Sequence, residues 1–268
     1  MNELLMNESL HDIQTIVDTL KDALLSRLGE EVELIFQYGS YIRGNPHHFS
    51  DIDISYVPVH EQTWECITVM VGETLVDLYP MHWSKLERMA DFLDVSSTVL
   101  LNNRVVYQRN QAAAERFKAL AERLKTTLQP EAKPEMLRRA MEIFLGSAKE
   151  YYLLVVQANA NHQLACIHHT QAILRAVFHC LAACNQACID TRKIEQVLAL
   201  PKLPARFEAA VKRVLATSKP SGLLAEVDAL LQSTRQMLLD EQSTLLRSET
   251  TFPDAFESAY PELKRDLQ

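Results

Sequence analysis

Val32-Glu-Leu-Ile-Phe-Gln-Tyr38 is followed directly by Gly39-Ser40 and, after ten intervening residues, by Asp51-Ile-Asp53-Ile-Ser-Tyr-Val57. Both apolar runs have the composition of strands, and the small residues between them indicate a turn. Side chains at positions i and i+2 of a strand point to the same face, so we expect Asp51 and Asp53 to lie side by side. Two carboxylates this close repel each other unless a cation lies between them. The pattern therefore predicts a site for Mg²⁺, which prefers hard oxygen ligands.

The turn before the two acids has the residue types of a phosphate-binding loop. Gly39 has no side chain, which lets backbone N–H groups approach an anion, and Ser40 adds a hydroxyl donor. Arg43 lies in the same loop, where it either pairs with a triphosphate or is a solvated loop charge. Ser50 directly precedes Asp51, and its hydroxyl is a further phosphate donor. We expect Gly39, Ser40, Arg43 and Ser50 to bind a nucleoside triphosphate.

Asp77 supplies a third carboxylate within the apolar run Leu75-Val-Asp-Leu-Tyr79. A carboxylate in a half-buried strand is costly unless it is paired or bound to a metal. With Asp51 and Asp53 it would form a cage for one or two Mg²⁺ ions, and it is also a candidate to accept the proton of an attacking hydroxyl. The alternatives are an edge-strand acid and an ion-pair partner.

The chain changes character near residue 111. Before it, periodicity predicts helices at 12–28, 61–71 and 84–94 and strands at 32–38, 51–57, 73–82 and 104–107. After it, helices are expected at 111–128, 134–158, 162–187, 191–199, 204–216 and 221–247, with an irregular arm after Ser248. The prolines of Gln129-Pro-Glu-Ala-Lys-Pro134 interrupt the helices. We therefore expect an α/β domain with a short mixed sheet and flanking helices at 1–128, and an all-α helical bundle at 129–268.

Composition narrows the class of protein. The formal net charge of −8 disfavours sequence-independent nucleic-acid binding, which depends on Lys and Arg. No apolar run reaches the length of about 18 residues that a membrane span needs. The acidic N-terminus lacks the basic region of a signal peptide, and the odd number of cysteines is a poor disulfide framework, so we expect a cytoplasmic protein.

A second, weaker metal pattern lies in the helical half. Cys180, Cys184 and Cys188 are spaced four apart with His179 beside them. Buried helix-face cysteines are the more usual reason for such spacing, and there is no CxxC pair to favour zinc.

Taken together, Tyr38-Gly39-Ser40, Arg43-Gly44 and Ser50-Asp51-Ile52-Asp53 resemble the signature of the nucleotidyltransferase superfamily that includes DNA polymerase β. The helical second half makes the chain similar to antibiotic nucleotidyltransferases of the kanamycin and lincosamide type. The resemblance implies that Asp51, Asp53 and Asp77 bind Mg²⁺. It also implies transfer of a nucleoside monophosphate from a triphosphate to a hydroxyl, with release of pyrophosphate.

In the helical half the resemblance is partial. Kanamycin-type enzymes carry Glu-x-x-x-Lys on the first helix after the linker, with the lysine on phosphate and the glutamate as base. Here Lys149 matches the lysine, whereas Leu145 occupies the glutamate position. The resemblance therefore implies Lys149 as a nucleotide ligand and leaves the proton acceptor to Asp77 or water. It also implies a homodimer, since kanamycin-type enzymes complete their site between subunits.

These observations predict a Mg²⁺-dependent nucleotidyltransferase that transfers AMP from ATP, the most abundant nucleotide, to a hydroxyl of a small-molecule acceptor such as an antibiotic. The alternative is a toxin–antitoxin type of nucleotidyltransferase that modifies or binds a partner protein.

Overall fold

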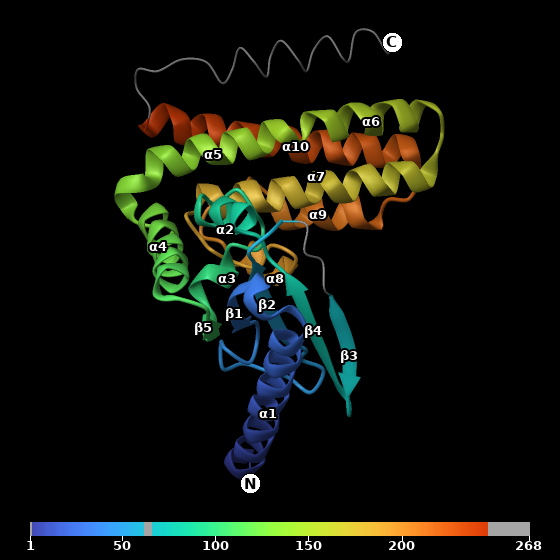
Figure 1. The fold of residues 1–268 in the computed structure, drawn as a ribbon. Coiled ribbons are helices and arrows are strands. Elements are labelled where there is room, and N and C mark those ends of the chain that lie inside the picture. The colour runs from blue at the N-terminus through green and yellow to red at the C-terminus, as the bar shows by residue number, and fades with distance from the viewer. Residues whose placement is uncertain (1, 62–65, 246–268) are drawn as a thin grey trace. The chain divides into compact units, whose positions relative to one another are not determined.

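The computed structural model describes residues 2–61 and 66–245 (Figure 1). The described chain divides into two compact units between Lys125 and Thr126. This division lies inside a helix, a little before the boundary expected at 128/129. Each unit is considered by itself below.

The first unit is built on a five-stranded sheet. Its strands are β1 (Val32–Tyr38), β2 (Ile52–Pro58), β3 (Ile67–Val71), β4 (Thr74–Pro80) and β5 (Asn103–Gln108). Their order across the sheet is β3-β4-β2-β1-β5. β2 and β4 are parallel and the other neighbouring pairs are antiparallel, so the sheet is mixed, as predicted.

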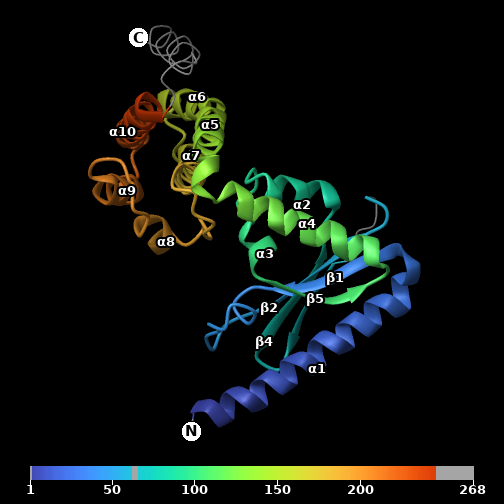
Figure 2. The ribbon, with the colours of Figure 1, turned by 90° about the vertical axis from the view of Figure 1, so that its left-hand side faces the viewer.

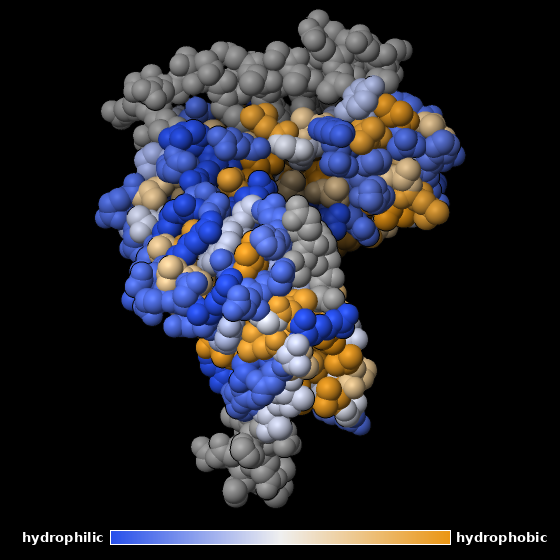
Figure 3. All heavy atoms as spheres, viewed as in Figure 1, coloured by the Kyte–Doolittle hydropathy of each residue, from blue (hydrophilic) through white to orange (hydrophobic). Residues whose placement is uncertain are grey.

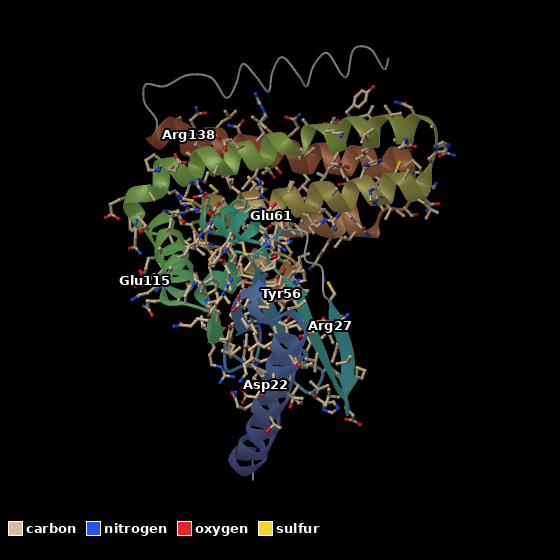
Figure 4. All side chains as sticks on the ribbon, viewed as in Figure 1. Asp22, Arg27, Tyr56, Glu61, Glu115 and Arg138 are labelled. Carbon is tan, nitrogen blue, oxygen red and sulfur yellow. The ribbon has the colours of Figure 1, made fainter. Side chains whose placement is uncertain are left out.

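Helix α1 (Asn2–Leu28) covers one face of this sheet (Figure 2). Its apolar side packs against the alternate strand residues that point to that face, which are all buried: Ile35, Ile52, Ile54, Tyr56, Val76 and Leu78. The opposite side of the helix is polar, with Asp22 and Arg27 exposed (Figure 4). Burying one apolar stripe of the helix against the β-branched face of the sheet forms the core of this layer. The 3-10 turn η1 (Gly29–Glu31) then connects α1 to β1.

The other face of the sheet is covered by α2 (Trp83–Ala90), α3 (Thr98–Leu101) and α4 (Gln111–Thr127) (Figure 2). Phe36 of β1 meets Phe117 of α4 with ring centroids 4.8 Å apart. Trp83 of α2 donates its indole N–H to Glu33, and the Arg116 guanidinium lies 4.3 Å from the centre of the Trp83 ring. These contacts fix α2 and α4 to the β1 side of the sheet.

The second unit is helical. It begins with η2 (Pro130–Ala132) and continues with α5 (Lys133–Gly146), α6 (Ala148–Asn159), α7 (Gln163–Cys184), α8 (Ile194–Leu198), α9 (Phe207–Ala216) and α10 (Pro220–Leu245). α7 is central, since it packs against α5, α6 and α10. A mixed α/β unit followed by a helical one confirms the predicted fold class.

Two expected helices were wrong. Residues 62–65 lie outside the description, but Ile67–Val71 forms the edge strand β3 where a helix was expected over 61–71. The expected helix over 134–158 is two helices, because the chain is interrupted at Ser147. There the Ser147 hydroxyl donates to the Phe144 carbonyl at 2.6 Å, in place of a regular helical hydrogen bond. The irregular arm expected after Ser248 lies outside the described residues.

In the described part of the chain, no helix has the length and apolar character to cross a membrane.

Candidate active site

The sheet register brings two of the predicted carboxylates together. Asp53 of β2 is the direct neighbour of Asp77 on the parallel strand β4, and of Tyr38 on the antiparallel strand β1. Directly paired residues point to the same face of a sheet. Tyr38, Asp53 and Asp77 therefore form one row across three strands, on the face opposite α1.

Gly39 is packed against the Asp53 carboxylate. Its φ of +90° is a conformation that L side chains rarely adopt, and a Cβ placed there would overlap Oδ2 of Asp53 and lie 3.1 Å from its Cγ. Glycine is required here for both its backbone conformation and its lack of a side chain. The chain leaving β1 thus passes directly over the carboxylate of β2, which places the turn beside the acid.

The turn after Gly39 is a tight loop with unused donors. The N–H groups of Arg43 and Asn45 donate to the carbonyls of Gly39 and Ser40 at 3.2 and 3.1 Å, so this segment coils without becoming a helix. In the described structure, the N–H groups of Ser40, Tyr41 and Ile42 have no hydrogen-bond acceptor, and the Ser40 hydroxyl oxygen is buried without a partner. Buried polar groups are normally paired, so this set of donors favours a ligand with several acceptor oxygens.

Ser50 and Arg43 have different surroundings from each other. Ser50 is buried, and its hydroxyl oxygen accepts the N–H of His47 at 2.8 Å while its own N–H donates to the His47 carbonyl. It therefore closes the end of the loop and keeps one hydroxyl proton to donate. The Arg43 side chain is exposed at the surface of the turn.

Asp51 lies just before β2, whose first residue is Ile52. Burial raises the pKa of the Tyr41 phenol, and the negative charge of Asp51 raises it further. Asp51 is thus close to Tyr41, which packs on the α1 side of the sheet. The side-by-side arrangement expected for Asp51 and Asp53 assumed that both belong to the strand, and only Asp53 does.

No three His, Cys, Asp or Glu side chains among the described residues are grouped closely enough to hold a metal ion. The three-carboxylate cage is therefore not preformed. This agrees with the chemistry of Mg²⁺, which usually binds through one or two carboxylates together with substrate phosphates and water. The carboxylates of Asp53 and Asp77 are neighbouring oxygen ligands for the cation, and the unpaired N–H and O–H groups of the turn can donate to phosphate oxygens. Together these groups fit a magnesium–triphosphate group in that way.

A pair of tyrosines belongs to the same face and was not predicted as part of the site. The hydroxyls of Tyr38 on β1 and Tyr79 on β4 are hydrogen-bonded to each other. Burial raises the pKa of Tyr38 well above that of an exposed tyrosine, and Tyr79 and the Asp53 charge raise it further. The Tyr38 phenol therefore stays protonated. In the sequence, an aromatic residue in a strand indicates only core packing.

The predicted residues of the helical half lie in the second unit. Lys149 is exposed on α6, whereas Leu145 is half-buried on α5. Because Ser147 separates the two helices, the four-residue spacing between these positions does not lie on one continuous helix. Lys149 stays a prediction.

Within the described residues of the helical unit, the predicted cysteine cluster and a carboxylate–histidine pair have different surroundings. Cys180 and Cys184 are buried in α7, where burial raises the pKa of both thiols. The described residues contain no metal-ligand group that includes them. Nearby, Nδ1 of His169 on α7 lies 2.8 Å from Oε2 of Glu150 on α6, which ties the two helices together.

No protein-family model matches the sequence, and no curated protein matches it. Among solved structures, the chain is similar to a nucleotidyltransferase-like protein from Exiguobacterium sibiricum, with 15% sequence identity and a TM-score of 0.43. The similarity covers 92% of this chain and 88% of that one. Similarity at this level does not assign a function, which has to be argued from the site.

Proposed function

We propose that this protein is a Mg²⁺-dependent nucleotidyltransferase that moves a nucleoside monophosphate from a triphosphate to a hydroxyl. One observation carries the proposal: Asp53 and Asp77 are direct neighbours on parallel strands, and the Gly39–Ser40 turn presents unpaired donors over Asp53. Carboxylates suit a cation, and adjacent N–H and O–H donors suit phosphate oxygens. A magnesium–triphosphate group needs both next to each other.

Each residue has a role in this proposal. Asp53 and Asp77 would hold Mg²⁺, and Asp51 is a further candidate ligand. The N–H groups after Gly39 and the Ser40 hydroxyl bind phosphate oxygens, with Arg43 and Ser50 as further donors. Lys149 of the second unit is proposed as an additional phosphate ligand. The metal supplies charge neutralisation for the triphosphate and the leaving pyrophosphate.

The proposed reaction is an in-line displacement at the α-phosphorus. The acceptor oxygen forms a bond to phosphorus, and the bond from phosphorus to the bridging oxygen of pyrophosphate breaks. Asp77 or a water molecule takes the acceptor's hydroxyl proton. The rigid row on the sheet holds the acids in place, so catalysis depends on positioning and charge stabilisation without a covalent enzyme intermediate.

The test is transfer from α-labelled ATP to a panel of hydroxyl compounds, including aminoglycoside and lincosamide antibiotics. We expect a labelled acceptor and pyrophosphate from the wild-type protein with Mg²⁺, and neither product from Asp53→Asn. Asp22→Asn, on the exposed side of α1, is the matched control and should transfer at the wild-type rate. Unchanged transfer by Asp53→Asn would refute the assignment.

A second candidate acceptor is a partner protein, and the edge of the sheet favours it. Val69, Met70 and Val71 are exposed on β3, which contains no charged residue or proline over Ile67–Val71 (Figure 3). Natural edge strands usually carry charged residues or proline, which prevent pairing with another chain. Label on a co-purifying protein, with none on any small molecule, would support this acceptor class over the first.

A further inference from the structure

The loop between β1 and β2 carries an exposed aromatic ring close to its end. Phe49 is 84% exposed, and among the described residues of the first unit it is the only aromatic one of the exposed large hydrophobic residues. An exposed phenyl ring forgoes the favourable free energy that its burial would bring. A single exposed apolar residue is common on protein surfaces, so the place of Phe49 decides what it means.

The backbone around Phe49 is held in a fixed turn. The Ser50 N–H donates to the His47 carbonyl at 2.8 Å, and the His47 N–H donates to the Ser50 hydroxyl oxygen at 2.8 Å. The N–H of Phe49 itself donates to Nδ1 of His47 at 3.2 Å. Ser50 is buried, which anchors this turn to the first unit. A ring on a fixed turn loses little conformational freedom when a ligand packs on it.

The His48 ring packs beside Phe49 and leaves most of the phenyl ring free. The centroids of the two rings are 4.7 Å apart and their planes are tilted by 60°. Nε2 of His48 lies 3.9 Å from Oε2 of Glu73, which precedes β4, so His48 connects this turn to the β3–β4 hairpin. The free face of an aromatic ring suits another flat π system, and a nucleobase is one.

Phe49 is within reach of a nucleotide bound at the candidate site. The two ends of the loop meet, because Tyr38 and Asp53, which flank it, are directly paired on β1 and β2. Phe49 is four residues before Asp53. Four residues of fully extended chain span at most about 14 Å, which is an upper limit for the distance between the two Cα atoms. The α-phosphate and the base of a nucleotide are separated by one ribose, so phosphates at the Gly39 turn and a base on Phe49 belong to one molecule of ordinary size.

We infer that Phe49 binds the nucleobase of the donor by stacking. The inference rests on the proposed function and deepens it, because it assigns a residue to the base where the turn and the carboxylates account only for phosphates and the cation. Stacking uses the ring face that every base has, and the two fused rings of a purine offer the larger face. The donor class is therefore a purine nucleoside triphosphate, and this contact does not select between adenine and guanine.

The test is calorimetric titration, with Mg²⁺, of three probes: non-hydrolysable analogues of ATP and of GTP, and inorganic tripolyphosphate, which has no base. We expect Phe49→Ala to bind both nucleotide analogues about 5- to 150-fold more weakly than wild type and tripolyphosphate equally well. Phe49→Trp should keep the wild-type affinities, since it keeps an aromatic face. Leu215→Ala is the control, because Leu215 is 63% exposed on α9 of the second unit.

The fluorescence of a 2-aminopurine nucleoside triphosphate is a second readout, because stacking quenches it. At concentrations that saturate each protein, binding should quench the fluorescence on wild type and not on Phe49→Ala.

The outcomes separate the two proposals. Failure of wild type to bind any of the probes would overturn the proposed function and this inference with it. Wild-type affinity of Phe49→Ala for the nucleotide analogues would overturn only the inference. An equal loss of affinity for the analogues and for tripolyphosphate would also overturn it, since Phe49 would then act on the phosphates through the loop. Loss of a co-purifying protein from Phe49→Ala, with unchanged nucleotide affinity, would make the ring a protein contact instead.

Discussion

Gly39→Ala should damage the site more than the fold. The new methyl group would occupy the position of the Asp53 carboxylate oxygen and lie 3.1 Å from the carboxylate carbon and 3.4 Å from Cβ of Asp53. The Asp53 side chain would have to rotate away from the turn, because the strand that carries it is fixed by neighbours on both sides. Gly29→Ala is a matched control: Gly29 also has a positive φ, of +53°, but an added Cβ there has nothing within 4 Å.

The expected magnitudes differ between folding and binding. A positive φ in a residue other than glycine is destabilising by about 1–3 kcal/mol, so both variants should lose stability of this order. At a concentration of Mg²⁺–ATP of about 100 times the dissociation constant, binding stabilises the native state by about 2.7 kcal/mol. If displacement of the Asp53 carboxylate weakens Mg²⁺–ATP binding about a hundredfold, this stabilisation falls to about 0.4 kcal/mol.

Urea unfolding with and without Mg²⁺–ATP measures both quantities in one experiment. We expect Gly29→Ala to keep the ligand-induced gain in unfolding free energy and Gly39→Ala to lose most of it. Equal gains in the two variants would show that the contact between Gly39 and Asp53 has no part in nucleotide binding.

Other predictions follow from single contacts. Arg43→Ala should weaken ATP binding without lowering the unfolding free energy, because its side chain is exposed; calorimetry of ATP binding checks the first and urea unfolding the second. Exposed Cys66 should react with a maleimide in the native protein at pH 8, and mass spectrometry of the labelled peptides reads this out. Burial raises the pKa of Cys188 from 9.0 to about 12. Its contribution to the free energy of unfolding is therefore fully present below pH 9 and is lost as the pH rises towards 12. Over that range the urea midpoint of the wild-type protein should fall more steeply than that of Cys188→Ala. Tyr151→Phe removes the hydrogen bond from α6 to the Asp228 carboxylate of α10, 3.0 Å long, and should lower the free energy of unfolding by about 1.5–3 kcal/mol.

The elements around the candidate site could be predicted because their sequence signals are local. β1 and β2 show β-branched and aromatic residues on both sides of a glycine turn, and a lone acid marks β4 at Asp77. The register that makes Asp53 and Asp77 neighbours is a property of the parallel pairing of β2 with β4, and no residue spacing contains it. The exact start of a strand is not contained in the residue pattern either: Asp51 was expected to be the first residue of the second strand, and β2 begins one residue later, at Ile52.

Three features had no readable signal. β3 has four of its five residues exposed, so the alternation that identifies a half-buried strand is missing. The break between α5 and α6 lies at Ser147, whose hydroxyl donates to the Phe144 carbonyl, and sequence periodicity does not reveal it. The Tyr38–Tyr79 pair depends on two strands separated by a third, so only the folded sheet brings it together.

Calorimetric titration with a non-hydrolysable ATP analogue tests the central claim most directly, in three samples: wild type with Mg²⁺, wild type with a chelator, and Asp53→Asn with Mg²⁺. The site described here predicts saturable binding in the first sample and at least a tenfold weaker dissociation constant, equivalent to about 1.4 kcal/mol, in the other two. The same dissociation constant in all three samples would contradict a magnesium-dependent nucleotide site at Asp53.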